Sequence, residues 1–138
     1  MRVLLDTCAL IFRAEGMDMT DASRSVIDRA ATADGVLISP VSAWEIGLLT
    51  DPARRKPLLL SMEAGAWFSR VLREPGALLA PFTPEIALQS TRLPGAFHRD
   101  PADRFLVATA RALNIAIITR DENIEAYAKA GHVKMIAC

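Results

Sequence analysis

Short apolar runs alternate with amphipathic stretches along the chain, and this alternation limits the possible fold more than any other feature of the sequence. The runs are rich in Val, Ile and Leu, which is typical of strands buried in a parallel sheet. We predict strands at residues 2–6, 36–39, 78–82, 115–119 and 133–136. The pattern predicts the α/β class: a three-layer α/β/α sandwich with a central, mostly parallel sheet of four or five strands.

Signals for the start of a helix follow several of these runs. Ser39-Pro40, Thr83-Pro84 and Asp100-Pro101 each offer a capping side chain followed by a proline suited to the first turn. We also predict that Thr7 caps a short helix and that Asp21 caps the next one. The predicted helices cover residues 8–13, 41–49, 58–73, 86–93 and 105–113, with a further helix after Asp21.

Length and composition exclude several classes of protein. The chain has 138 residues, of which 51% are hydrophobic, so we expect a single domain over residues 1–138. No apolar run reaches the roughly 18–20 residues of a membrane span, and the N-terminus lacks the pattern of a secretory signal. The 16 basic residues balance the 16 acidic ones, which argues against a polycation that coats nucleic acid.

The two cysteines, Cys8 and Cys138, have neither metal-site nor disulfide spacing. We therefore expect a reduced, cytoplasmic protein.

Four carboxylates occupy positions that parallel strands bring to one edge of a sheet. Asp6 ends the first predicted strand and Asp121 follows the fourth, while Glu45 and Asp103 lie in the first turns of predicted helices. Each has an ordinary alternative role as a helix cap, a turn residue or an exposed helical acid. Together they would repel one another unless protons or cations neutralised them.

The chain offers no histidine or cysteine set for this site, because His98 and His132 are the only histidines. All-oxygen ligands suit Mg²⁺ or Mn²⁺, and one ion or a pair would serve phosphodiester chemistry. His98 is interpreted as an ordinary surface or core histidine. Asp100 lies three residues before Asp103 and precedes Pro101, so we favour a helix cap over a metal ligand, with support of the metal site as the other option.

The sequence resembles the PIN-domain ribonucleases, in particular the VapC-type toxins of toxin–antitoxin pairs. Four segments carry the resemblance, in the family's order and spacing along nearly the whole chain: Val3-Leu4-Leu5-Asp6-Thr7, Ser39-Pro40-Val41-Ser42-Ala43-Trp44-Glu45-Ile46, His98–Ala110 and Ile118-Thr119-Arg120-Asp121. The resemblance implies a PIN-like, Rossmann-like fold and Mg²⁺-dependent hydrolysis of RNA, with Mn²⁺ as a substitute. It also implies a homodimer inhibited by a cognate antitoxin. The implied catalytic metal ligands are Asp6, Glu45, Asp103 and Asp121.

Further residues near these acids are candidates for supporting the site or contacting RNA. Thr7 and Thr119 are candidates for hydrogen bonds to the acids or to phosphate, with backbone capping as the alternative. Arg104 and Arg120 are candidates for contacts to RNA phosphate or to acidic groups of the antitoxin, with local ion pairing or a solvated surface position as the alternative. The Arg54-Arg55-Lys56 run is either a basic patch or a solvated loop.

A second class of function stays open from the sequence. A catalytically inactive PIN-like interaction module would keep the acidic pocket as a vestige or use it to bind arginines of a partner. Binding of Mn²⁺ and cleavage of RNA separate the enzyme from this module.

Overall fold

The computed structural model describes residues 1–138, and its centre is a sheet of five parallel strands. The strand order is β3-β2-β1-β4-β5. The strands are β1 (Val3–Leu5), β2 (Val36–Ile38), β3 (Ala77–Leu79), β4 (Ala116–Thr119) and β5 (Met135–Ala137). The predicted α/β class is therefore confirmed, with every strand pair parallel.

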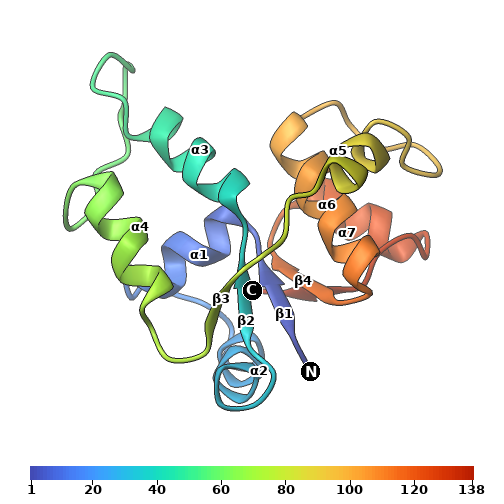
Figure 1. Cartoon of the computed structure of the whole chain (residues 1–138), viewed down its shortest axis with the longest axis horizontal. Helices are drawn as coiled ribbons and strands as arrows, with labels where there is room; N and C mark the ends of the chain where they lie inside the picture. Colours follow the sequence, from blue (N-terminus) through green and yellow to red (C-terminus); the bar gives the residue numbers. More distant parts are fainter.

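Seven helices connect the strands: α1 (Thr7–Ala14), α2 (Asp21–Thr32), α3 (Pro40–Leu49), α4 (Ala64–Leu72), α5 (Pro84–Ser90), α6 (Pro101–Leu113) and α7 (Glu122–Lys129). Figure 1 shows α1, α3 and α4 on one side of the sheet and α5, α6 and α7 on the other. The longest helix, α6, has 13 residues, and no helix combines the length and apolarity needed to cross a membrane.

Two apolar cores lie on the opposite faces of the sheet, because successive side chains of a strand point to opposite sides. In β1, Val3 and Leu5 pack with Leu10 and Trp67 in the core beneath α1 to α4. Leu4 points the other way, into the core that contains Leu106 of α6 and Ile124 of α7. The sheet is thus covered on both faces, as a three-layer sandwich requires.

The predicted proline-containing helix starts are confirmed. The side chains of Ser39, Thr83 and Asp100 accept hydrogen bonds from backbone N–H groups in the first turns of α3, α5 and α6. The two other predicted caps are wrong by one residue. Asp6, not Thr7, caps α1 by accepting from Ala9 N at 2.7 Å, and Thr20, rather than Asp21, caps α2.

The predicted helix over residues 58–73 is wrong in its first part, because α4 begins only at Ala64. Glu63 caps this helix by accepting from Gly65 N and Ala66 N. The leucines before it supply the apolar pattern without being helical, since Leu58 and Leu60 pack against the core from an irregular segment.

The strands β1, β2 and β4 match the prediction to within one residue at each end, while β3 and β5 differ by more. β3 ends at Leu79 instead of residue 82, because its partner β2 ends at Ile38 and the chain there turns into α3. β5 is displaced toward the C-terminus, at Met135–Ala137.

Gly76, in the turn between α4 and β3, provides a test of how closely this turn packs against α2. Its φ is +82°, and a Cβ atom would lie 2.2 Å from the carbonyl oxygen of Ala31. Gly131 has a similar φ of +88° but open space around it, so it serves as the matched control.

We expect Gly131→Ala to cost about 1–2 kcal/mol of folding free energy, the penalty of a left-handed conformation for alanine. Gly76→Ala should cost clearly more, because the backbone of α2 must also move. Urea denaturation of both variants measures the difference, and equal losses of stability would contradict this account of the turn.

Candidate metal centre

Asp6 and Asp121 lie together because the strands that precede them are neighbours. β1 pairs with β4, with Leu5 opposite Ile118, and Asp6 N donates to Ile118 O at 3.1 Å. Both carboxylates also cap helices: Asp6 caps α1, and Asp121 Oδ1 accepts from Ile124 N of α7 at 3.0 Å. The same parallel pairing therefore fixes two acids at the carboxyl edge of the sheet.

The hydroxyl of Thr119 connects these two residues. It donates to Asp6 Oδ2 and accepts from Asp121 N at 3.0 Å. Thr119 is fully buried, so its bond to Asp6 is shielded from water. The structure thus places this predicted supporting residue directly against two of the acids.

Glu45 approaches from α3 and is held by Thr7. The Thr7 hydroxyl donates to Glu45 Oε1 and lies 3.0 Å from Ser42 Oγ. Because the Thr7 hydroxyl donates its hydrogen to Glu45, Ser42 is the donor in the bond between Ser42 and Thr7. Ser42 is fully buried and is a supporting residue that the sequence analysis did not identify.

Asp103 enters the site from the first turn of α6. Asp100 caps this helix, with Oδ1 accepting from Asp103 N at 3.3 Å. Asp100 is exposed, whereas only 17% of the Asp103 side chain is accessible. The geometry therefore gives Asp100 the role of a cap that supports Asp103.

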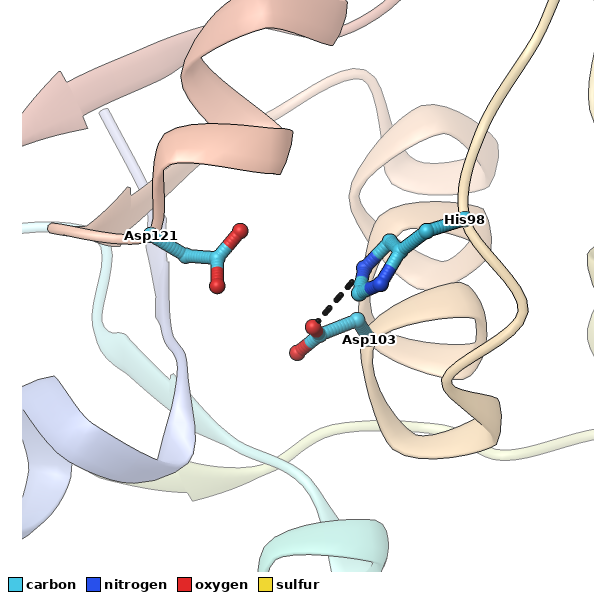
Figure 2. Close-up of side chains that lie close together, drawn as sticks. All are labelled: His98, Asp103 and Asp121. Carbon is cyan, nitrogen blue, oxygen red and sulfur yellow. Dashed lines mark ion pairs between the residues drawn. The ribbon is translucent and has the colours of Figure 1, made fainter.

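His98, interpreted from the sequence as an ordinary histidine, is a second residue of this site whose role the sequence did not indicate. Its Nε2 lies 3.0 Å from Asp103 Oδ2, and one ligand atom from each of His98, Asp103 and Asp121 lies within 4.8 Å of the others. Figure 2 shows the Asp121 carboxylate pointing across toward the other two side chains. The sequence did contain one signal for this contact, the short spacing between His98 and Asp103. With His98 in the loop before α6 and Asp103 in its first turn, the loop can bring the two side chains together.

Burial and mutual repulsion raise the pKa values of the clustered acids. The pKa of Asp6 rises to about 6, mainly through burial, with the charges of Glu45 and Asp121 adding to the effect against the Thr119 hydrogen bond. The pKa of Asp103 rises to about 7, again mainly through burial, with a contribution from Asp100, Asp121, Glu45 and Asp6. Burial also raises the pKa of Glu45. The charges of Asp6, Glu45 and Asp121 all contribute to the raised pKa of Asp103, so the four predicted ligands lie near one another.

The chain matches one protein family over most of its length: residues 3–130 fit the model of the PIN domain. The chain belongs to this family. Ribonuclease VapC22 of Mycobacterium tuberculosis (strain ATCC 25618 / H37Rv) is 26% identical over 126 residues, which cover 91% of each protein. The predicted resemblance to PIN-domain proteins of the VapC type is thus confirmed.

Solved structures show the same fold. VapBC2 from Rickettsia felis, crystallised with a DNA fragment from its promoter, matches with a TM-score of 0.70 at 12% identity, over 99% of this chain and 98% of the other. FitAcB from Neisseria gonorrhoeae matches with a TM-score of 0.55 at 19% identity, over 97% and 96% of the two chains.

Two arginines next to the acids of this PIN domain donate hydrogen bonds to backbone carbonyl groups of the same chain. Arg104 donates from Nε to Ser90 O at 2.8 Å and from Nη1 to the carbonyls of Phe97 and His98, both at 3.1 Å. Arg120 donates to Asp18 O at 2.9 Å and lies 4.0 Å above the ring of Phe12. Both arginines thus make local contacts, but with backbone carbonyl groups rather than the ion pairs offered as the alternative.

The chemistry of the cluster suits a divalent cation. Several carboxylates with raised pKa values form a site that gains when a cation replaces protons, and oxygen donors suit Mg²⁺ or Mn²⁺. An apolar cavity of about 510 Å³ is lined by other residues, among them Leu10, Ile27 and Trp67. It is therefore separate from the acidic cluster.

The raised pKa values predict how stability depends on pH in the absence of metal. Asp6 and Asp103 bind protons more tightly in the folded chain than in the unfolded chain. Their contribution therefore favours folding at low pH and is lost as the pH rises through about 6 and about 7. In EDTA, the wild-type free energy of unfolding should fall from pH 5 to pH 8, and adding Mg²⁺ should restore part of it.

Removing one charge should reduce this loss. The rise of the Asp103 pKa from 3.8 to about 7 sets an upper bound of about 4 kcal/mol at 1.36 kcal/mol per unit. Solvent screening lowers the expected gain for Asp103→Asn at pH 8 to the order of 1–2 kcal/mol. Asp51→Asn, in an exposed loop, is the control, and an Asp103→Asn variant no more stable than this control would contradict the repulsion.

Proposed function

We propose that this PIN domain is a metal-dependent endoribonuclease that hydrolyses RNA phosphodiesters in the cytoplasm and acts as the toxin of a toxin–antitoxin pair. The observation that carries the proposal is that Asp6, Glu45, Asp103 and Asp121 come together at one edge of the sheet, where burial raises the pKa values of Asp6, Glu45 and Asp103. The name of the relative Ribonuclease VapC22, which aligns with 91% of the chain, supports RNA as the substrate.

The four acids would hold the cation, and their hydrogen bonds keep them in place. When bound, Mg²⁺ or Mn²⁺ activates water and offsets the negative charge that develops at phosphorus. Thr119 fixes Asp6 and the backbone of Asp121, while Thr7 fixes Glu45. Rigid carboxylates limit the reorganisation needed during the reaction, because their orientation is set before RNA arrives.

Attraction of RNA to a chain with no net charge must be local. The exposed loop Arg54-Arg55-Lys56, between α3 and α4, is the basic segment that we propose contacts the RNA backbone. Arg104 and Arg120 contribute less, since both are bonded to carbonyl groups of their own chain.

Substitution of the capping acids tests the nuclease activity without removing the caps. Asparagine is as good a helix cap as aspartate, so Asp6→Asn and Asp121→Asn should fold while losing the charge that holds the cation. We expect RNA cleavage with Mg²⁺ or Mn²⁺ to fall by at least about 100-fold in each variant, the scale seen when one group that stabilises a transition state is removed.

Asp51→Asn is the matched control for this assay and should cleave RNA at the wild-type rate. Undiminished cleavage in both Asp6→Asn and Asp121→Asn would contradict the assignment. A wild-type chain that neither cleaves RNA nor binds Mn²⁺ would instead be the inactive interaction module.

Expression in cells tests the proposed toxin role. Wild-type protein alone should arrest growth, whereas Asp121→Asn should not, because the effect requires catalysis. Co-expression of the cognate antitoxin should restore growth of the cells that express the wild-type protein. Equal growth with the two forms of the protein, at equal expression levels, would count against a toxin and leave the nuclease chemistry to be decided by the cleavage assay.

We also propose that the protein forms a homodimer. Trp44 and Leu48 on α3 and Leu88 on α5 are large apolar side chains that are about half exposed or more, as is common where a second chain packs.

A further inference from the structure

His98 is built into the acidic site by contacts on two sides. Its ring packs edge-on against Phe97, with centroids 4.6 Å apart, and Phe97 packs against Tyr127 at 4.8 Å. The backbone carbonyl groups of Phe97 and His98 both accept from Arg104, the residue that follows Asp103. The imidazole is thus fixed relative to the first turn of α6.

The Nε2 atom of His98 is shielded from solvent but makes no hydrogen bond. It lies 3.0 Å from Asp103 Oδ2, in a contact without the direction of a hydrogen bond. Two neighbouring donors of an octahedral ion, each at about 2.1 Å from it, are separated by about 3.0 Å. The measured spacing is therefore that of two ligands on adjacent corners of one coordination shell.

We propose that His98 Nε2 is a ligand of the cation together with Asp103 and Asp121, and that it makes this site prefer Mn²⁺ over Mg²⁺. The inference rests on the proposed function, since it concerns the same cation. Imidazole nitrogen is a good ligand for transition metals, whereas Mg²⁺ favours oxygen. The alternative interpretation of this contact is an ion pair in which His98 only orients Asp103. Such an ion pair would leave the preference between Mn²⁺ and Mg²⁺ unchanged.

Figure 2 shows the three side chains arranged around a common space, with the His98–Asp103 contact on one side and Asp121 facing it. These residues come from the loop before α6, from α6 and from the start of α7. Nitrogen ligation would tie that loop to both helices. Asp6 and Glu45 then supply negative charge from the β1 and α3 side of the site.

Spin-echo spectroscopy of the Mn²⁺-loaded full chain tests the proposal directly. A ring nitrogen bonded to Mn²⁺ modulates the echo, and the chain has only two histidines to which such a signal can be assigned. We expect the modulation in the wild type and in His132→Gln, and its loss in His98→Gln. Circular dichroism and thermal melting check that both variants are folded.

Calorimetric titration with MnCl₂ and with MgCl₂ provides a second measurement. His98→Gln should weaken Mn²⁺ binding by at least about tenfold, the lower end of what even an outer partner of a metal ligand contributes. Binding of Mg²⁺ should change by less than about twofold, because Mg²⁺ gains little from nitrogen.

Each failure has a distinct meaning. A wild-type Mn²⁺ complex without nitrogen modulation would overturn the role of His98, even if the His98→Gln variant did not fold, and so would equal weakening of Mn²⁺ and Mg²⁺ binding. RNA cleavage measured on the same wild-type sample separates this result from failure of the proposed function: cleavage without nitrogen ligation leaves the ribonuclease intact, and absence of both metal binding and cleavage removes both proposals.

Discussion

The parallel pairing of β1 with β4 is the constraint on which the acidic site depends. Leu5 and Ile118 lie opposite each other, so both strands end level and Asp6 and Asp121 follow at the same edge. Thr119 then bonds to both residues from a fully buried position. A shift of one residue in this register would turn the side chains at the strand end to the opposite face and separate the two carboxylates.

Helix capping offsets part of the electrostatic cost of bringing these acids together. Asp6 places Oδ1 on the N-terminus of α1 and Oδ2 on Thr119, and Asp121 places Oδ1 on the N-terminus of α7. The positive end of a helix dipole stabilises such charges, although burial still raises the pKa of Asp6 to about 6. The same side chains thus stabilise the fold and supply the negative field for a cation, which explains why their positions at strand ends are readable in the sequence.

The sequence could predict those features that depend on local chemistry. The apolar runs predict the strands of the sheet, and the cap-proline pairs at Ser39, Thr83 and Asp100 mark the starts of three helices, because both signals act within a few residues. The start of α4 was not predictable in this way, since Leu58 and Leu60 satisfy a helical pattern while packing from an irregular segment. The partners Ser42 and His98 were missed because their roles arise from contacts to Thr7 and Asp103 that only the folded chain creates. Asp6, Glu45, Asp103 and Asp121 were accessible from sequence because strand order and helix starts place them, and their roles as ligands remain a proposal.

The hydrogen bonds of Arg104 show that this positive side chain has a structural role. An arginine next to Asp103 would be expected to attract phosphate, yet its guanidinium group spans Ser90, Phe97 and His98 and holds the loop that carries the imidazole. Tyr127 strengthens the same loop by donating to Pro94 O. Because this arginine is used to build the site, the proposed function would take the positive charge at the reacting phosphate from the bound cation, and the charge that attracts RNA from exposed residues such as Arg54 and Arg55. For a chain with zero net charge, this division would assign the attraction of RNA to the exposed basic loop and the neutralisation of charge during the reaction to the metal centre.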